Sequence, residues 1–346
     1  MNTGLLCYCR AGFEPELAGE LTDRAAEAEL GVYARTERGS GHVLLLGDDA
    51  AAMSRALPFR KLIFARQKLR LLTELSGLDP KDRITPMMEA LAGAGRHGEL
   101  VVETPDTDEA KPLAGLARAL GNALRPALRQ RGFLSAQDDA RLPRLHVCLL
   151  AGDHLLLAQG DTNDSSPWPM GVPRLRMLHD APSRSALKLD EAILTLLDPN
   201  ERDTLLREGM WAADLGAAPG GWSWILARRQ IRVYAIDNGP LAETAMATGL
   251  IEHLRADGFS WQPPRMLDWM VCDMVEQPRR VASRMAEWFA NGWCRRAIFN
   301  LKLPMKKRWQ ETRLCLDLFE QQAGRPLTVR AKQLYHDREE ITVYAG

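Results

Sequence analysis

One stretch of this sequence decides the fold that we expect, Asp214-Leu215-Gly216-Ala217-Ala218-Pro219-Gly220-Gly221. It follows an apolar segment, residues 211–215, that is typical of a buried strand, and a helical pattern opens at Trp222. A glycine-rich turn at this junction lets a ligand approach the backbone and presents the free N–H groups of a helix N-terminus. Asp237 stands at the end of the next predicted strand, where a carboxylate can bind ribose hydroxyls. The stretch therefore predicts a nucleotide-like ligand.

The spacing of the glycines restricts which ligand fits. The G-x-G-x-x-G pattern of dinucleotide-binding turns is absent, because Gly216 is followed only by Gly220 and Gly221. Pro219 removes a backbone donor and stiffens the turn, which suits a ligand without a pyrophosphate. No Gly-Lys-Ser/Thr phosphate loop is present here either. An NAD-dependent oxidoreductase is therefore disfavoured.

Residues 178–346 alternate short apolar strands with helical stretches. The predicted strands are residues 211–215, 233–237, 269–273, 297–301 and 339–344. This alternation is typical of a mostly parallel, doubly wound α/β sheet. We expect a Rossmann-like domain over this part of the chain, preceded by a smaller α/β region.

Four polar residues stand where this fold places ligands. Asp273 and Lys302 end predicted strands, Glu339 begins the last one, and Lys188 lies early in a helix that Ser183 or Ser185 can cap. A lysine whose pKa is lowered by burial and by a second lysine could accept a proton from a weakly acidic hydroxyl. Two carboxylates would orient the lysines. Such a site would work mostly by positioning its reactants and needs no metal.

These motifs resemble the FtsJ-like 2'-O-methyltransferases. The D-L-G-x-x-P-G-G turn is similar to their S-adenosylmethionine motif, and the four polar residues resemble their K-D-K-E tetrad. The stretches APSRSALKLDEA (181–192), NGWCRRAIFNLKLPMKKR (291–308) and QLYHDREEITVYAG (333–346) are most similar to the bacterial branch that methylates a cytidine 2'-hydroxyl of 23S rRNA.

The resemblance implies a role for each site residue. Lys302 would be the general base, with Asp273, Lys188 and Glu339 as the other catalytic residues; Glu340 is the alternative to Glu339, which the Arg-Glu pairing favours. The residues expected to contact S-adenosylmethionine are Ser185, Gly216, Ala218, Pro219, Gly220, Gly221, Asp237, Asp257 and Asp273. Asp257 would bind the adenine amino group.

The first half of the chain is expected to bind RNA. Residues 1–55 have the strand and helix patterns of a small ferredoxin-like α/β subdomain, with a helix at 14–27. Residues 56–172 resemble a THUMP domain, with a strand near 101–104, a helix at 111–131 and a hairpin at 145–158. Arg118, Arg125 and Arg129 can share one face of that helix and engage phosphates. A proline-rich linker is expected at 167–182.

Local charge, rather than the net charge of zero, favours a nucleic-acid partner. Six basic residues and no acid lie between Arg55 and Arg70. Seven basic residues and one acid, Glu311, lie between Arg295 and Arg313. Each run is a candidate phosphate-binding surface, with a solvated helix face as the alternative. The expected partner is 23S rRNA or a large-subunit precursor.

Composition indicates a soluble cytoplasmic protein. No run of 18 apolar residues and no signal-peptide pattern occurs, and six scattered cysteines are typical of reduced thiols. No metal site and no membrane partner are expected. The oligomeric state stays open, with a monomer slightly favoured.

Two other functions stay open. An RNA base methyltransferase acting on amino groups would carry an Asn/Asp-Pro-Pro-Tyr/Phe sequence, whereas this chain has Cys272-Asp273-Met274-Val275; carbon-5 methylation would need a nucleophilic cysteine. A non-catalytic rRNA-binding assembly factor could keep the same fold, since fold alone does not establish chemistry.

Overall fold

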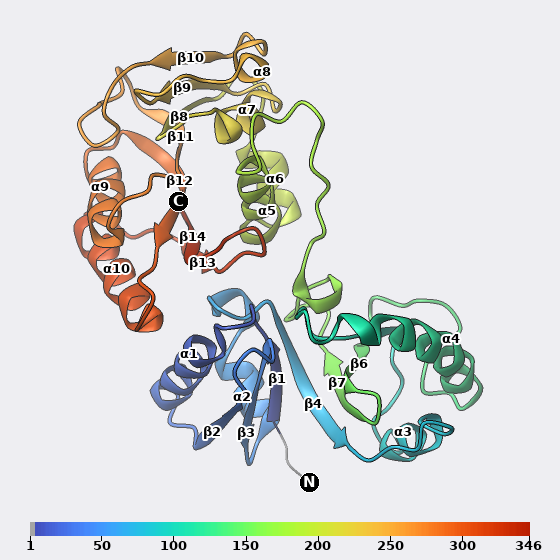
Figure 1. The fold of residues 1–346 in the computed structure, drawn as a ribbon. Coiled ribbons are helices and arrows are strands. Elements are labelled where there is room, and N and C mark those ends of the chain that lie inside the picture. The colour runs from blue at the N-terminus through green and yellow to red at the C-terminus, as the bar shows by residue number, and fades with distance from the viewer. Residues whose placement is uncertain (1–3) are drawn as a thin grey trace. The chain divides into compact units, whose positions relative to one another are not determined.

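The computed structural model describes residues 4–346 and divides into two compact units (Figure 1). The first unit ends at Pro173 and the second begins at Arg174, within the expected linker. No helix among residues 4–346 is long and apolar enough to cross a membrane.

The first unit is built on one seven-stranded sheet. Its strands, in spatial order, are β2 (Val32–Thr36), β3 (His42–Gly47), β1 (Gly4–Tyr8), β4 (Gln67–Leu75), β7 (His154–Gly160), β6 (Arg144–Ala151) and β5 (Glu99–Glu103). All neighbours are antiparallel except β5 and β6. The long strand β4 pairs with β1 along residues 67–71 and with β7 along residues 70–75, so the sheet runs without a break through the whole unit.

The helices of the first unit are α1 (Glu14–Glu27), α2 (Ala50–Ala56), α3 (Ile84–Ala90) and α4 (Ala114–Gln130), with 3-10 turns η1 (Phe59–Lys61), η2 (Lys111–Leu113) and η3 (Pro169–Gly171). Helix α1 has the bounds predicted from the sequence. The predicted helix at 111–131 begins with the turn η2, so α4 starts at Ala114. Leu124 and Leu128 of α4 are fully buried in a core with Leu145 of β6. The division of this unit into subdomains at residue 55, which falls inside α2, stays a proposal.

The basic run from Arg55 to Arg70 is not one solvated helix face. It passes from α2 through η1 into β4, and Arg66 and Lys68 are buried. The Lys68 ammonium donates to the carbonyl oxygens of Ser54 and Leu57, both at 2.9 Å, and forms an ion pair with Asp164. Lys68 therefore fastens β4 to neighbouring segments of its unit.

The second unit is built on a second seven-stranded sheet. Its spatial order is β10 (Ile251–Leu254), β9 (Arg232–Ile236), β8 (Trp211–Leu215), β11 (Leu267–Cys272), β12 (Cys294–Lys302), β14 (Glu340–Ala345) and β13 (Val329–Lys332). The first five strands are parallel to one another, and β14 is antiparallel to both β12 and β13. The expected mostly parallel, doubly wound sheet is confirmed.

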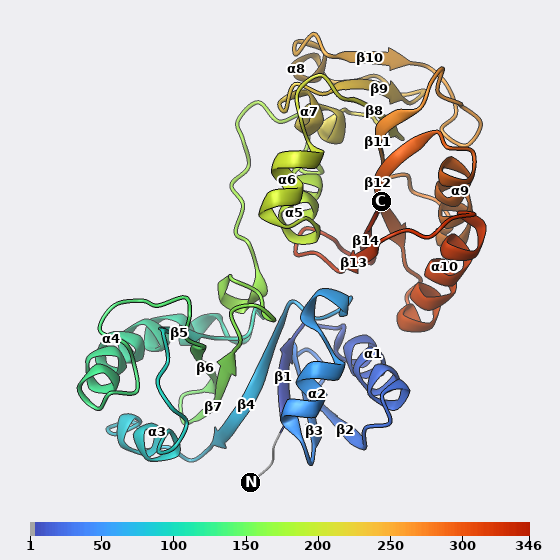
Figure 2. The ribbon, with the colours of Figure 1, turned by 180° about the vertical axis from the view of Figure 1, so that it is seen from behind.

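Helices cover both faces of this sheet (Figures 1 and 2). On one side lie α9 (Pro278–Ala290) and α10 (Arg308–Gln322), and on the other α5 (Ala186–Leu196), α6 (Pro199–Leu205), α7 (Gly221–Ala227) and α8 (Glu243–Met246). Leu189 of α5 and Ile225 of α7 are buried against Val233, Trp269 and Tyr344 of the sheet. Burial on both faces explains why the central strands are almost continuously apolar.

Candidate active site

The strand order of the second unit reverses its direction between β8 and β11. From β8 the chain proceeds to β9 and β10 on one side, then returns to β11 and β12 on the other. Loops that leave the carboxyl ends of β8 and β11 therefore diverge, and ligands bind at such a switch point. Gly216 follows β8, Asp273 follows β11, and Lys302 ends β12.

The turn after β8 requires its glycines. Gly216 and Gly220 have φ angles of +77° and +107°, which side chains rarely adopt. A Cβ atom on Gly216 would lie 2.5 Å from Cγ of Met274, and one on Gly221 would lie 2.5 Å from Oγ of Ser185. The bond between Ala218 and Pro219 is cis. The turn is thus packed so closely that only bare backbone fits, and it faces the start of α5.

The cofactor residues predicted from the sequence lie along this edge of the sheet. Asp237, directly after β9, is half-buried; its carboxylate accepts the N–H of Ala218 at 3.0 Å and that of Gly239 at 2.7 Å. Ser185 immediately precedes α5, and its carbonyl accepts the indole N–H of Trp222 at 3.0 Å. Its hydroxyl does not cap the helix but lies 2.6 Å from the hydroxyl of Ser183. The structure therefore brings Ser185, the glycine turn and Asp237 together.

Asp257 precedes Gly258, which packs against the glycine turn: a Cβ atom on Gly258 would lie 3.8 Å from the backbone N of Gly216. Asp257 is exposed in the segment after β10, where its carboxylate accepts the N–H of Phe259 at 3.0 Å. Its present hydrogen-bond partner belongs to its own turn, so the expected contact with the adenine amino group stays a prediction.

Asp214, the last but one residue of β8, received no role from the sequence. It is fully buried and accepts the hydroxyl of Ser223 at 2.7 Å. Desolvation raises the pKa of Asp214 to about 7, and the charges of Asp273 and Asp237 act in the same direction, against the hydrogen bonds from Ser223. This carboxyl links β8 to α7 beneath the glycine turn.

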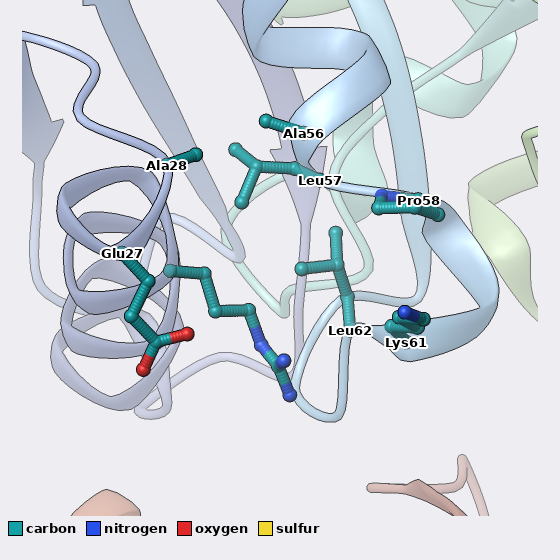
Figure 3. Close-up of a pocket in the computed structure, with 8 residues that line it drawn as sticks. Glu27, Ala28, Ala56, Leu57, Pro58, Lys61 and Leu62 are labelled. Atoms are coloured by element: carbon teal, nitrogen blue, oxygen red, sulfur yellow. The ribbon is translucent and has the colours of Figure 1, made fainter.

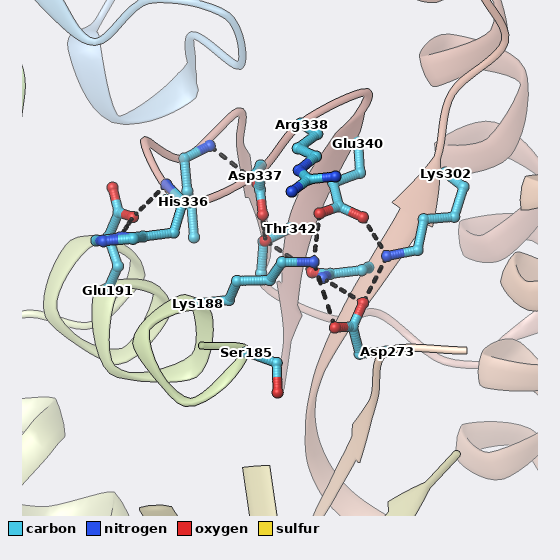
Figure 4. Close-up of polar contacts among 12 residues, drawn as sticks. Ser185, Lys188, Glu191, Asp273, Lys302, His336, Asp337, Arg338, Glu340 and Thr342 are labelled. Carbon is cyan, nitrogen blue, oxygen red and sulfur yellow. Dashed lines mark hydrogen bonds and ion pairs between the residues drawn. The ribbon is translucent and has the colours of Figure 1, made fainter. Parts of the chain in front are cut away.

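Four charged residues form a closed cluster in which lysines and carboxylates alternate (Figure 4). Oδ1 of Asp273 forms an ion pair with Nζ of Lys302 at 2.6 Å, and its Oδ2 forms one with Nζ of Lys188 at 3.3 Å. Oε1 of Glu340 forms an ion pair with Nζ of Lys188 at 2.5 Å, and its Oε2 forms one with Nζ of Lys302. The side chains are 5–22% exposed, so opposite charges are held at contact distance with little screening by water.

The fourth member of the cluster is Glu340, so the expectation of Glu339 is wrong. The side chain of Glu340 is 5% exposed, whereas that of Glu339 is 45% exposed and pairs with Arg308 at 2.6 Å. Alternation along a strand explains the difference: Lys302 and Glu340 are register partners in β12 and β14, and the residue before Glu340 has the opposite parity.

The protonation of Lys302 also departs from the sequence-based expectation. Burial lowers the pKa of Lys302, but the charges and hydrogen bonds of Asp273 and Glu340 outweigh burial and raise the pKa above the usual value of a lysine. The prediction that a second lysine lowers the pKa of Lys302 is therefore wrong for this state of the protein. Lys302 is an ammonium ion at neutral pH.

A set of buried polar residues that the sequence analysis missed supports the cluster. Glu191, one turn after Lys188 on α5, accepts the backbone N–H groups of Tyr335 and His336 at 2.8 and 2.9 Å and the Nδ1 of His336 at 2.7 Å. It thereby fixes the segment that leads into β14. The others are Asn300, Asp337 and Thr342. In the sequence, Asn300, Asp337 and Thr342 share one feature: each is a polar residue within or beside an apolar strand.

Cys272 does not have the properties of a nucleophile. It is fully buried beside Asp273, and desolvation raises the pKa of its thiol to about 12. All six cysteines lie within the described residues and are buried thiols. This disfavours carbon-5 methylation of a base.

A separate pocket in the first unit lies near α1 and α2 (Figure 3). Arg24, Ala28, Leu57, Lys61 and Leu62 are among the residues that line it. Arg24 pairs with Glu20 at 3.1 Å. The pocket belongs to a different unit from the lysine–carboxylate cluster. Within residues 4–346, no group of three or more His, Cys, Asp or Glu side chains could hold a metal ion.

The fold and this site define a Rossmann-like methyltransferase, and comparison with known proteins agrees. The family model described as FtsJ-like methyltransferase matches residues 181–321. The models described as RlmM ferredoxin-like domain and as Ribosomal RNA large subunit methyltransferase M, N-terminal, match residues 1–69 and 82–160.

Curated relatives match over almost the whole chain. The Ribosomal RNA large subunit methyltransferase M of Xanthomonas campestris pv. campestris (strain B100) is 68% identical over 343 residues, covering 99% of both chains. The protein of the same name from Stenotrophomonas maltophilia (strain R551-3) is 67% identical, covering 99% of this chain and 97% of the relative. This chain belongs to the ribosomal RNA large subunit methyltransferase M family, whose methyl donor is S-adenosylmethionine.

Proposed function

We propose that this chain methylates the 2'-hydroxyl of a cytidine in 23S rRNA, with Lys302 as the general base. The observation that carries the proposal is the alternating cluster of Lys188, Asp273, Lys302 and Glu340 at the same edge of the sheet as the glycine turn. A ribose hydroxyl is too weak an acid to react unaided, so a positioned base is required. The names of the relatives supply the large-subunit rRNA as the substrate class.

The residues of the turn fit S-adenosylmethionine. Gly216, Gly220 and Gly221 have no side chains that would keep a ligand from the backbone, and Ser185 lies against the same turn. Each carboxylate oxygen of Asp237 has lone pairs beyond the one that its backbone donor uses, so it can also accept a ribose hydroxyl. Asp257 would reach the adenine amino group. When bound, the cofactor supplies a methyl group on a positively charged sulfur.

The residues of the cluster have different roles in the proton transfer. The neutral amine of Lys302 accepts the proton of the 2'-hydroxyl as that oxygen is methylated. Asp273 and Glu340, which already contact this nitrogen, then stabilise the ammonium ion that forms. Lys188 contacts the second oxygen of each carboxylate and so holds both in place. Because Lys302 starts as an ammonium ion, the reaction rate should rise with pH.

RNA contacts are proposed on both units. Lys306 and Lys307 are exposed directly after β12 and would hold phosphates beside the acceptor ribose. In the first unit, Arg118 is exposed on α4, whereas Arg125 and Arg129 already donate to the carbonyls of Leu100 and Ser135. Residues 56–172 would act as a THUMP-like RNA-binding domain, residues 1–55 as its ferredoxin-like companion, and the protein would work in the cytoplasm.

The test uses radiolabelled S-adenosylmethionine and unmodified 23S rRNA. Alkali cleaves RNA next to free 2'-hydroxyls, so label in alkali-resistant dinucleotides identifies ribose methylation, and sequencing the dinucleotides names the base. Lys302→Ala removes the amine, and Lys302→Arg keeps a positive charge that cannot be given up at any working pH. Both variants should lose transfer by at least about 100-fold, the scale of general-base catalysis, with nearly unchanged cofactor affinity.

Three other results would contradict the proposal in different ways. Label in ordinary mononucleotides would make a base the acceptor. Near-normal transfer by Lys302→Arg would reduce Lys302 to an electrostatic role. RNA binding without transfer, on free rRNA and on precursor particles alike, would favour the non-catalytic assembly factor.

A further inference from the structure

Three buried polar residues lie beside the lysine–carboxylate cluster without belonging to it. Asn300 in β12 and Thr342 in β14 are fully buried and are register partners, each two residues into its strand from Lys302 and Glu340 respectively. Asp337, just before β14, is buried as well. Polar side chains in such places are costly unless their hydrogen bonds are satisfied, so their partners are informative.

The contacts of these residues form a chain that ends at the catalytic cluster (Figure 4). The side chain of Asn300 lies 2.8 Å from Oδ1 of Asp273. On its other side, Oγ1 of Thr342 lies 2.7 Å from Oδ1 of Asn300. The same Oγ1 lies 3.1 and 3.3 Å from the two oxygens of Asp337, whose Oδ2 also accepts the N–H of Leu334 at 2.9 Å.

The direction of each hydrogen bond follows from the groups that can donate. Asp273 faces two lysines and accepts, so Asn300 must present its NH2 group to Asp273 and its oxygen to Thr342. The hydroxyl of Thr342 has a single proton, and Asn300 takes it. The contact between Thr342 and Asp337 is then a hydrogen bond only if Asp337 carries a proton and donates it.

The surroundings of Asp337 favour the protonated carboxyl. Burial, followed by the charge of Glu340, raises the pKa of Asp337 well above the usual value of an aspartate. Glu191 on α5 acts in the same direction, and the backbone N–H of Leu334 and the charge of Lys188 act against it. This direction agrees with the proton that the hydrogen-bond donors and acceptors assign to Asp337.

We propose that Asn300 and Thr342 are positioning residues for Asp273, and that Asp337 holds a proton that directs the chain Asp337→Thr342→Asn300→Asp273. The inference rests on the proposed function, because it assigns Asp273 the task of holding the Lys302 ammonium. Oδ1 of Asp273 receives both Asn300 and Lys302, so the Asn300 amide fixes the oxygen that Lys302 contacts at 2.6 Å.

The test compares Thr342→Val, which removes only the hydroxyl, with Thr342→Ser, which keeps it. Thr342→Val should lower the single-turnover rate constant about tenfold, the loss of one net hydrogen bond, with cofactor affinity unchanged. Because Asp273 would no longer be held against Lys302, the pKa of Lys302 should fall and the rise of rate with pH should move to lower pH. Thr342→Ser should recover both properties.

Asp337→Asn tests the direction of the chain. Its neutral amide can donate to Thr342 and accept from Leu334, so the pH profile should stay as in the wild type and the rate should fall less than threefold. Loss as large as in Thr342→Val would mean that Asp337 is a charged acceptor and would overturn the assignment. The infrared carbonyl band of a neutral carboxyl, present at pH 8 and lost in Asp337→Asn, gives an answer even if Thr342→Val does not fold; its absence refutes the protonated state.

Different results would contradict the general-base role of Lys302 and the positioning chain through Thr342. Near-normal transfer by Lys302→Arg would remove the proposed general-base role of Lys302 whatever Thr342 does. An inactive Lys302→Arg beside a Thr342→Val variant with the wild-type rate and pH profile would leave the function standing and refute the positioning chain. A slower Thr342→Val with an unshifted pH profile would mean that Thr342 serves only stability, which also refutes it.

Discussion

The two adjacent glutamates at the start of β14 offer a matched test of the site. Glu340 contacts both lysines and is 5% exposed, whereas Glu339 pairs with Arg308 and is 45% exposed. Glu340→Gln and Glu339→Gln make the same chemical change one residue apart. If the parity of β14 selects the catalytic carboxylate, only the first change should disturb methyl transfer.

The expected loss follows from the contacts. A glutamine at position 340 can still accept from one lysine, but its NH2 group would face the other. At least one charge-assisted hydrogen bond disappears, about 1.5–3 kcal/mol, which corresponds to a loss of about 10- to 150-fold in rate. Glu339→Gln removes one half-exposed ion pair of about 0–1 kcal/mol, so the rate should stay within about fivefold.

The pH dependence provides an independent readout. Asp273 and Glu340 together raise the pKa of Lys302, so the wild-type rate should rise about tenfold per pH unit through the neutral range, where the neutral amine is scarce. In Glu340→Gln one raising charge is gone, the pKa falls, and the plateau begins at lower pH. The neutral amine is then more abundant but also less basic, so the rate gains little from the shift.

The assay is single-turnover transfer of labelled methyl groups to 23S rRNA between pH 6.5 and 9.5, with cofactor affinity measured by calorimetry. A Glu340→Gln rate within threefold of the wild type would refute the catalytic role of the cluster. A larger loss in Glu339→Gln than in Glu340→Gln would refute the register that places Glu340 opposite Lys302.

Two further predictions concern the cofactor turn and its support. Asp237→Ala should raise the calorimetric Kd for S-adenosylmethionine at least about tenfold, because a charge-assisted acceptor is lost; an unchanged Kd would remove Asp237 from the site. Asp214 has a pKa of about 7, above the ordinary 3.8, so the folded state binds the extra proton and stability falls as pH rises from about 4 to 7, by at most about 1.4 kcal/mol per pH unit. Urea unfolding should show this slope in the wild type relative to Asp214→Asn, and a pH-independent difference between the two proteins would contradict it.

The sequence predicted the central part of the sheet because each strand there carries its own signal. Residues 211–215 form β8 with the predicted bounds, and the glycine turn lies where the strand-to-helix junction was expected. The edge strands β10 and β13 were missed, because IEHL and VRAK are four residues long and half polar. The long strand β4 was missed because its lysine and arginine belong to a basic run that suggested a phosphate-binding surface, and only pairing with the distant strands β1 and β7 makes it a strand.

For the site, the sequence identified three of the four cluster residues but misplaced the acid. The pattern Glu340-Ile341-Thr342-Val343 alternates polar and apolar residues, and it already assigns Glu340 and Thr342 to one face. The sequence analysis favoured Glu339 on its Arg-Glu pairing; in the structure Glu339 pairs with Arg308, and an ion pair of this kind at the surface does not indicate catalysis. The raised pKa of Lys302 could not be predicted from the sequence, because it depends on distances between segments that are far apart in the chain.

The antiparallel direction of β14 explains why one catalytic residue begins a strand while the others follow strand ends. In the parallel part of the sheet the carboxyl ends of the strands form the site edge, and those of β11 and β12 supply Asp273 and Lys302. Strand β14 runs the other way, so its first residue lies at that edge, and the register sets Glu340 opposite Lys302 and Thr342 opposite Asn300. A parallel strand in this place would bring its last residue to the site. The reversal therefore lets a single antiparallel pair contribute both a charged partner for the base and, two residues deeper, the buried polar pair that orients Asp273.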